Sequence, residues 1–234
     1  GSMTTWNPNS DALYERGLLP SFGDSFIEDY NYDFVAGYNR FYTKMAERFE
    51  LPEDVTLEIT MLNVWLAHYK NRAYTSGYDS DKPFSIVFYG ETDGKIDTNK
   101  EFGRATTTLK EVFGNSGIGG SAGEPRDVNL QTLFGSSVKT QGTFYLAFEY
   151  ADDMTVTTSD PNLGRSYMGM NTVLHANGEA TLYAKPHAVP ANSTVKADGN
   201  WYRIDEIDPT KKGLGNYFII WAKSSISGVA LNSM

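Results

Sequence analysis

The sequence predicts an all-β protein with two antiparallel sheets packed as a sandwich. Apolar residues alternate with other residues in several segments, which is typical of strands whose two faces meet different surroundings. Dipeptides of Asp or Asn followed by Gly favour tight turns, and they separate some of these segments. The 234 residues include 22 glycines and 15 tyrosines. Many turns together with many aromatic strand formers are typical of β-rich proteins.

The first part of the chain is expected to be an irregular lead-in. Pro and Gly residues interrupt any period through residues 1–28, and we predict only a short helical turn there, near Asp11–Arg16. Gly1–Met3 reads as the remnant of an expression tag. We therefore expect one sandwich domain at 29–226 and a short tail at 227–234, a division that suits the length of the chain.

Two segments follow in which strand and helix must be distinguished. In residues 38–49, Phe41, Met45 and Phe49 would share one helical face, whereas the alternative is an extended strand that enters the sandwich; we favour the strand. Residues 55–69 are β-branched and apolar and lack helix caps, so we predict a strand.

The clearest alternation occurs in residues 83–90, 142–150 and 216–223. Each of these segments is apolar on one face and mixed or apolar on the other, which suits two sheets that pack face to face. The residues predicted to share a face are Phe84, Ile86 and Phe88; Phe144, Leu146, Phe148 and Tyr150; and Tyr217, Ile219 and Trp221.

The connections are predicted from glycine. Asp93-Gly94, Asn177-Gly178 and Asp198-Gly199 favour hairpin turns, because glycine adopts a positive φ without steric cost. We therefore predict hairpins around Asn177-Gly178, with arms at 173–176 and 180–185, and around Asp198-Gly199. Residues 114–125 are rich in glycine and are predicted to be a loop; no Gly-Lys-Ser/Thr follows, so they do not form a phosphate-binding loop.

The order of the predicted strands also suggests a family. The stretches concerned are DYNYDFVAGYN, KMAERFELPEDVTLEITMLNVWLAHY, FSIVFYGETDGKIDTNKEFGRATTTLKEV, VKTQGTFYLAFEY, NTVLHANGEATLYAKP, GNWYRIDE and GLGNYFIIWAK. In order and spacing this series resembles a jelly-roll-like β-sandwich module of exported and cell-surface proteins, lipoproteins among them, of Bacteroidetes. The resemblance covers residues 29–223 and carries no short motif and no catalytic residue.

The resemblance implies several properties. It implies an antiparallel jelly-roll-like sandwich and an extended opening, which is why we favour a strand at 38–49. It also implies export, with attachment to other domains or to a lipid anchor. We therefore expect a location at the cell surface or outside the cell, reached through a signal sequence that this chain does not contain. Relative to the module, residues 114–125 would be an insertion.

Charge and composition exclude some classes of function. The net charge of −9 argues against a nucleic-acid partner, because such partners are bound largely through Lys and Arg contacts to phosphate. The chain has no cysteine, which excludes thiol catalysis and Cys-ligated zinc. No apolar run reaches the roughly 18 residues that a membrane helix needs.

The sequence shows no catalytic constellation. His68, His175 and His187 lack the spacing of metal ligands. Glycosidases use two carboxylates held close together, and the candidates on predicted strands or near them are Glu58, Glu149 and Glu206. Nothing in the sequence pairs them, and we expect Glu149 to be solvated on the outer face of its strand. We therefore predict no enzyme and no catalytic residue.

Ca²⁺ is the one cofactor that the sequence suggests. Asp93, Asp97 and Asn99 supply oxygen ligands within a short segment, but their spacing is not that of an EF-hand loop. Since Gly94 directly follows Asp93, a hairpin turn is the favoured interpretation. We expect no other metal and no organic cofactor.

Aromatic residues give the best candidates for ligand binding. Trp65 and Trp221 lie in long apolar segments and are assigned to the core. The ligand-binding candidates lie near predicted turns and loops beside polar residues, which is typical of sugar-binding surfaces; they are Trp201, Tyr202, Tyr74 and Tyr78. The alternative is that these rings only cover the ends of the sandwich.

These observations lead to one expected function and two alternatives. We expect a non-catalytic module of a cell-surface or secreted protein that binds carbohydrate or adheres, with a glycan or another surface protein as its partner. The first alternative is a structural spacer domain of a larger exported protein, and the second is a carbohydrate-active enzyme.

Overall fold

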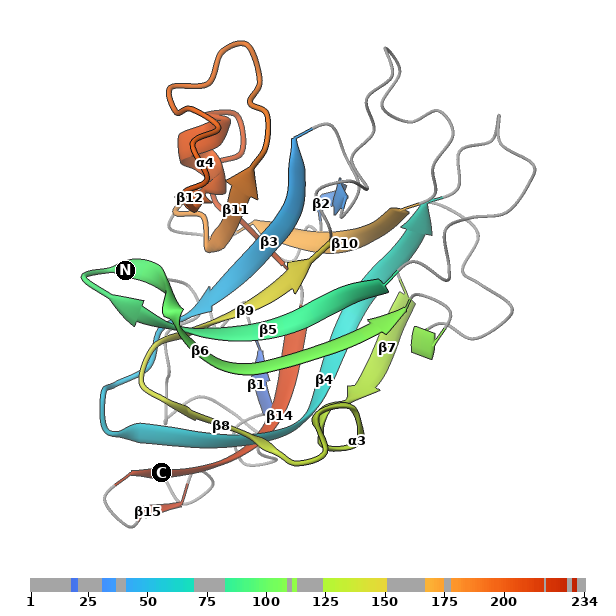
Figure 1. The fold of residues 1–234 in the computed structure, drawn as a ribbon, viewed down its shortest axis with the longest axis vertical. Helices are drawn as coiled ribbons and strands as arrows, with labels where there is room; N and C mark the ends of the chain where they lie inside the picture. Colours follow the sequence, from blue (N-terminus) through green and yellow to red (C-terminus); the bar gives the residue numbers. More distant parts are fainter. Residues whose placement is uncertain are drawn as a thin grey trace.

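The structure is a computed structural model that describes most of the chain. The described residues, to which all statements below refer, are 18–20, 31–36, 41–69, 83–108, 111–112, 124–150, 167–174, 178–216, 218–226 and 229–230. These residues form two antiparallel sheets and two short helices (Figure 1). No helix in this part of the chain has both the length and the apolar character needed to span a bilayer.

The larger sheet is built around one long strand. Among the described residues this sheet has nine strands. β4 (Val55–Tyr69) pairs with four of them, β14, β10, β7 and β8, and the others are attached further out. The remaining strands of the sheet are β1 (Leu18–Pro20), β2 (Asn31–Ala36), β7 (Glu124–Asn129), β8 (Val138–Gln141), β10 (Tyr167–Leu174), β13 (Leu214–Asn216), β14 (Phe218–Ile226) and β15 (Val229–Ala230).

The direct partners of β4 are arranged along its two edges. β14 pairs with residues 55–64 and β10 with residues 66–69, while β8 pairs with residues 56–59 and β7 with residues 61–66. The pairing of β4 with β14 shifts register near Thr60. Because of this shift, the core contains Leu57 and Ile59 before it and also Leu62 and Val64 after it. A bulge of this kind bends the strand, so one strand contributes to the core along most of its length.

The smaller sheet has six strands in the described part of the chain, and every pairing in it is antiparallel. In spatial order its strands are β12 (Tyr202–Arg203), β11 (Leu182–Pro186), β3 (Tyr42–Phe49), β9 (Phe144–Glu149), β5 (Pro83–Thr92) and β6 (Lys95–Thr108). The strand predicted at 38–49 is therefore confirmed over Tyr42–Phe49 as β3, which has a partner on each side; residues 38–40 lie outside the described residues.

The chain passes repeatedly from one sheet to the other. It runs from β3 in the smaller sheet to β4 in the larger sheet and back to β5, and later through β8, β9, β10 and β11 in the same alternating way. Crossings of this kind are typical of jelly-roll topologies. The predicted fold class, an all-β antiparallel sandwich, is confirmed.

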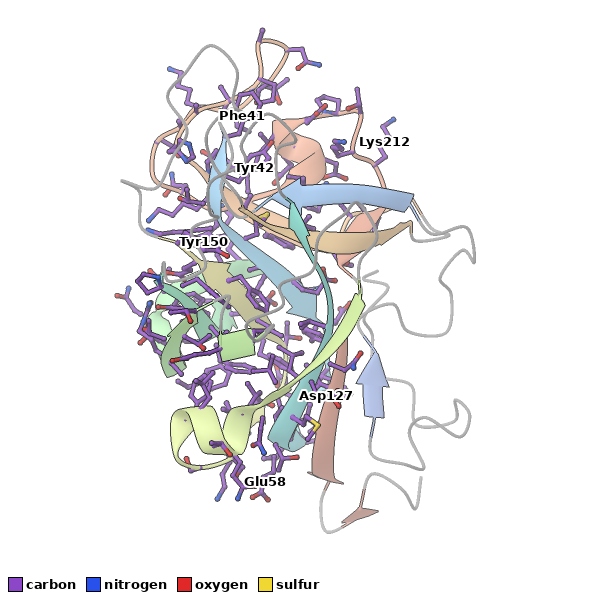
Figure 2. All side chains as sticks on the ribbon, turned by 90° about the vertical axis from the view of Figure 1, so that its right-hand side faces the viewer. Phe41, Tyr42, Glu58, Asp127, Tyr150 and Lys212 are labelled. Carbon is purple, nitrogen blue, oxygen red and sulfur yellow. The ribbon has the colours of Figure 1, made fainter. Side chains whose placement is uncertain are left out.

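The core lies between the two sheets, and its members follow the predicted alternation. Phe84, Ile86 and Phe88 of β5 are buried in it, as are Phe144, Leu146, Phe148 and Tyr150 in and just after β9. The rings of Phe49 and Phe144 stack with centroids 5.0 Å apart. Tyr42 and Tyr150, both labelled in Figure 2, also belong to this core. Full burial of each large apolar side chain contributes about 1.5–3 kcal/mol to folding.

The Asp93-Gly94 turn is confirmed, whereas the other two predicted hairpins are wrong. β10 pairs with β2, β4 and β13, while β11 pairs with β3 and β12, so the segments flanking Asn177-Gly178 lie in different sheets. Gly178 has the positive φ of 74° that a turn requires, but a turn signal does not determine which sheet receives the next strand; Asn177 lies outside the described residues.

The turn at Asp198-Gly199 also exists without its hairpin. Gly199 has a φ of 82°, yet residues 195–197 form no strand, and β12 pairs with β11 instead. The predicted loop at 114–125 ends two residues too late, because Glu124 and Pro125 belong to β7 and pair with β4. The predicted helical turn near Asp11–Arg16 lies outside the described residues.

Two short helices complete the fold, α3 (Leu130–Phe134) and α4 (Ile204–Ile207). The Asn129 side chain accepts a hydrogen bond from the Thr132 backbone N–H and caps α3, which ends at Gly135 with a φ of 80°. α4 follows β12 directly and lies at the β11–β12 edge of the smaller sheet (Figure 1). This edge carries the candidate site.

Candidate functional site

The smaller sheet is covered by aromatic residues on the face that points away from the core. A second buried cluster lies there, which we call the outer cluster; its residues are Ala46, Val87, Tyr89, Tyr145 and Ala147. Three half-buried side chains pack over it, namely Ile96, Tyr183 and Trp201. The outer face of a sandwich is commonly polar, so the rings on this face point to a site.

A hollow of about 490 Å³ opens over the outer cluster. It lies between the tip of the β5–β6 hairpin, β11, the segment before β12 and the start of α4; we call it the Trp201 hollow. Its apolar lining consists of Ile96, Tyr183 and Trp201, and its polar lining includes Lys95, Thr98, Lys185, Asn200, Tyr202, Arg203 and Glu206. A second, smaller hollow shares Tyr183 and Arg203 with it and continues toward Arg48 and Glu50.

The two rings in the Trp201 hollow are held by two rings beneath them. Trp201 meets Tyr89 at 62° with centroids 6.3 Å apart, and Tyr183 meets Tyr145 at 88° with centroids 5.3 Å apart. Edge-to-face geometry of this kind is favourable for aromatic pairs. The rings are therefore fixed before any ligand arrives, which lowers the entropic cost of binding.

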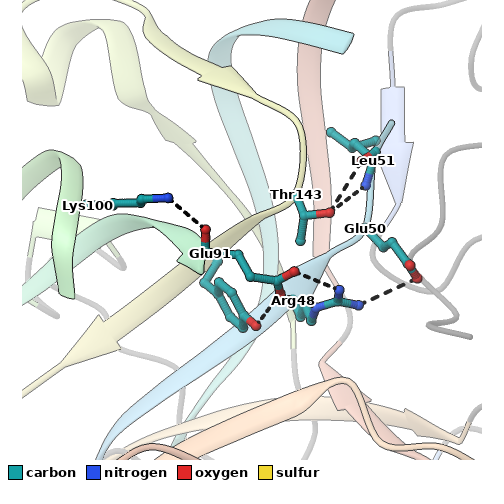
Figure 3. A network of polar contacts seen from close by, with 7 residues as sticks. Arg48, Glu50, Leu51, Glu91, Lys100 and Thr143 are labelled. Carbon is teal, nitrogen blue, oxygen red and sulfur yellow. Dashed lines mark hydrogen bonds and ion pairs between the residues drawn. The ribbon is translucent and has the colours of Figure 1, made fainter. Parts of the chain in front are cut away.

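The Tyr145 ring is in turn fixed by a polar network. Its hydroxyl donates to Glu91 Oε2 at 2.6 Å, and Arg48 donates to both carboxylate oxygens of Glu91 at 2.7 and 3.2 Å. Figure 3 shows Arg48 between Glu91 and Glu50, whose carboxylate lies 3.5 Å from the Arg48 guanidinium. Paired hydrogen bonds between arginine and a carboxylate are strong and directional.

The network shifts the proton affinities of its members. Burial would raise the pKa of the Glu91 carboxyl, but the hydrogen bonds from Arg48 and Tyr145 and the charge of Arg48 hold this pKa below its usual range. Burial, followed by the hydrogen bond to Glu91, raises the pKa of Tyr145. Glu91 is therefore an ionised acceptor and Tyr145 a neutral donor at neutral pH.

Tyr89, which lies under Trp201, has a comparable support. Its hydroxyl donates to Glu149 at 2.5 Å and accepts from Arg104 at 3.1 Å. Burial, then the hydrogen bond to Glu149, raises the pKa of Tyr89. The expectation that Glu149 is solvated is wrong: its side chain is only 10% exposed, and its carboxylate contacts the Tyr89 hydroxyl and the Arg104 guanidinium.

The carboxylates considered for catalysis have separate structural partners. Glu206 accepts a hydrogen bond from the Arg203 backbone N–H at the start of α4, and Glu58 accepts one from the Ser137 hydroxyl in the region of the other sheet. Glu58 lies toward the α3 end of the molecule, whereas α4 lies at the opposite end (Figures 1 and 2). The structure does not bring Glu58 and Glu206 together.

The oxygen-rich segment considered for Ca²⁺ shapes the β5–β6 hairpin. Asp97 accepts hydrogen bonds from the Thr92 hydroxyl and the Asn99 backbone N–H, both at 2.9 Å, and these bonds lower the pKa of Asp97. Asp93 occupies the turn with a φ of 53°. Throughout the described ranges, no three His, Asp or Glu side chains gather into a group that would hold a metal ion.

The structure places two of the four predicted ligand-binding residues in one hollow. Trp201 and Tyr202 both line it. Asp198 orients Tyr202 and the turn before it, since it accepts from the Asn200 N–H at 3.1 Å and from the Tyr202 hydroxyl at 2.6 Å. Tyr74 and Tyr78 lie outside the described residues, as does His175. The side chains of Trp65 and Trp221 are not described either, although their backbones belong to β4 and β14.

Sequence reasoning missed several residues of this hollow. Tyr183 and Lys185 share a face of β11 because residues two apart in a strand point the same way, and this alternation was visible in the sequence. What the sequence did not show is that β12 pairs with β11 and that the β5–β6 tip reaches the same place.

Comparison of the chain with protein-family models, with curated proteins and with solved structures finds no match. The functional argument therefore rests on the site itself.

Proposed function

We propose that this chain is a non-catalytic carbohydrate-binding module of a cell-surface or secreted protein, and that the Trp201 hollow holds the sugar. The observation that carries the proposal is the presence of two fixed rings, Trp201 and Tyr183, in one hollow with amide, hydroxyl and charged side chains around them. A pyranose presents apolar C–H groups on its face and hydroxyls at its edge, so it matches such a lining.

The size of the hollow supports the proposal. Its volume of about 490 Å³ lies within the range of roughly 300–1,000 Å³ that is typical of small-molecule sites. The smaller hollow of about 190 Å³ beside it would extend the surface for a second sugar unit along the same strand edge. Location at the cell surface or outside the cell is part of the proposal and is supported by the resemblance of the strand order.

The first test compares substitutions of two aromatic residues, one in the hollow and one outside it. Trp201→Ala removes the ring from the hollow and should weaken glycan binding by roughly ten- to a hundredfold, because a ring of this size contributes about 1.5–3 kcal/mol when it is covered. Phe102→Ala is the control, since Phe102 is 38% exposed and does not line the hollow. Screening on a glycan array, followed by affinity electrophoresis of all three proteins, provides the measurement.

The outcomes separate the candidate functions. If no plant, host or microbial glycan binds the wild-type chain, the carbohydrate role fails and a structural spacer is favoured. If Phe102→Ala weakens binding as much as Trp201→Ala does, the site is wrongly placed. Turnover of a bound oligosaccharide would contradict the non-catalytic part of the proposal.

A further inference from the structure

The charge of the Trp201 hollow is opposite in sign to that of the molecule. The chain carries a net charge of −9, yet the charged residues that line the hollow are Lys95, Lys185 and Arg203 against Glu206 alone. Lining charges of one sign inside a shallow recess raise the local concentration of ligands of the opposite sign. The hollow therefore favours an anion although the protein as a whole repels one.

The four charged residues of this lining differ in whether they are already engaged. Arg203 donates from Nε to the Asp205 carboxylate at 2.5 Å, and the Glu206 carboxylate accepts from the Arg203 backbone N–H at 2.8 Å. In the described part of the chain, Lys95 and Lys185 form neither an ion pair nor a side-chain hydrogen bond. These two ammonium groups remain available to a ligand.

The backbone brings the two lysines to the hollow from separate strands. Lys185 follows Tyr183 by two residues on β11 and so lies on the same face. Lys95 begins β6 directly after the Asp93-Gly94 turn. Tyr89 pairs with Glu101 but Gly90 pairs with Asp97, so residues 98–100 bulge out of the ladder. Such a bulge bends the hairpin, and Ile96 at its tip packs on the outer cluster.

We propose that the hollow selects acidic sugars, with the rings of Trp201 and Tyr183 against the pyranose and with Lys95 and Lys185 on its anionic group. This inference rests on the proposed function and adds the class of ligand to it. A uronic acid carries a carboxylate directly on the ring carbon skeleton, and a sulfated sugar carries its anion on a hydroxyl oxygen. Both present the pairing of an apolar face with a nearby negative charge.

The experiment uses acidic polysaccharides together with one pair that differs in charge but shares a backbone. Polygalacturonic acid and its methyl ester form the central pair, because esterification removes the charge while the sugar rings are retained. Alginate and hyaluronan are further polysaccharides with carboxylates. Carrageenan is sulfated and lacks carboxylates, so it shows whether the hollow binds sulfate as well. Affinity electrophoresis and isothermal titration of the full chain measure binding at low and at moderate salt.

Two lysine substitutions carry the test, with a third as control. The double variant Lys95→Gln and Lys185→Gln should weaken binding of an acidic polysaccharide by about tenfold or more, since hydrogen bonds to charged groups are among the stronger ones. It should also reduce the dependence of binding on salt, and it should leave a neutral ester unaffected. Lys139→Gln, on an exposed position of β8 in the other sheet, should change neither.

The outcomes distinguish this inference from the function on which it rests. Binding of neutral glycans alone, or an equal effect of the double lysine variant on polygalacturonic acid and its ester, overturns the selection of acidic sugars. If Trp201→Ala still weakens binding in that case, the proposed sugar-binding role of the hollow stands. Binding of no polysaccharide in the panel overturns both.

Discussion

Tyr145 and Tyr183 form one edge-to-face pair, but their hydroxyl groups have different roles. The Tyr145 hydroxyl donates to the ionised Glu91 carboxylate, whereas the Tyr183 hydroxyl has no hydrogen bond within the described residues. The first tyrosine therefore connects the ring layer to the Arg48–Glu91 pair. The second presents its ring to the hollow.

This difference predicts the effect of removing each hydroxyl on stability. Tyr145→Phe leaves the half-buried Glu91 carboxylate with one donor fewer and should lower the free energy of unfolding by about 1–2 kcal/mol. Tyr183→Phe keeps the ring pair and should change the free energy of unfolding by only a few tenths of a kcal/mol. Urea denaturation of the two variants and the wild-type chain at neutral pH measures both values. Equal loss in the two variants would show that the Glu91 hydrogen bond does not stabilise this layer.

At the scale of the elements, the β5–β6 hairpin sets one wall of the hollow. Its turn has a positive φ at both central residues, 53° at Asp93 and 73° at Gly94, as a two-residue turn of type I′ requires. A Cβ at Gly94 would meet no other atom within 4 Å. A side chain at position 94 would therefore lower stability only through its unfavourable backbone conformation.

A matched pair of substitutions isolates this backbone cost. Gly94→Ala should lower the free energy of unfolding by about 1 kcal/mol, because an L-residue is disfavoured in the left-handed region. Asp93→Gly replaces a residue already at positive φ with one that adopts it freely, so it should be tolerated. Thermal and urea denaturation of the two variants compare them. A neutral Gly94→Ala variant would mean that the turn relaxes to another type.

The elements also show which parts of the fold the sequence predicts. Alternation is a local property, and it identified β5 and β9 with the correct face toward the core because each apolar side chain must meet the opposite sheet. The pairing of β10 and β11 depends instead on which sheet has room for the next strand, and no local signal near Gly178 carries that information. The same holds for the site, where Trp201 was found from its place after a turn, but Lys95 was not.

At the scale of the whole molecule, the sandwich separates two surfaces of the smaller sheet. The inner face contributes rings such as Phe88 and Phe144 to the core, while the outer face holds tyrosines that are hydrogen-bonded to half-buried carboxylates. The side chains on this outer face leave part of it uncovered, and the Trp201 hollow lies there. A strongly acidic protein thus presents a recess lined by rings and lysines.

The most direct test of this account follows the indole N–H signals of the four tryptophans by NMR. The Trp201→Phe variant identifies the Trp201 signal. The wild-type protein is then titrated with a short oligosaccharide cut from the polysaccharide that binds it. We predict that the Trp201 signal shifts saturably, with the same dissociation constant that calorimetry gives. A Trp201 signal that stays fixed while binding saturates would contradict the central claim.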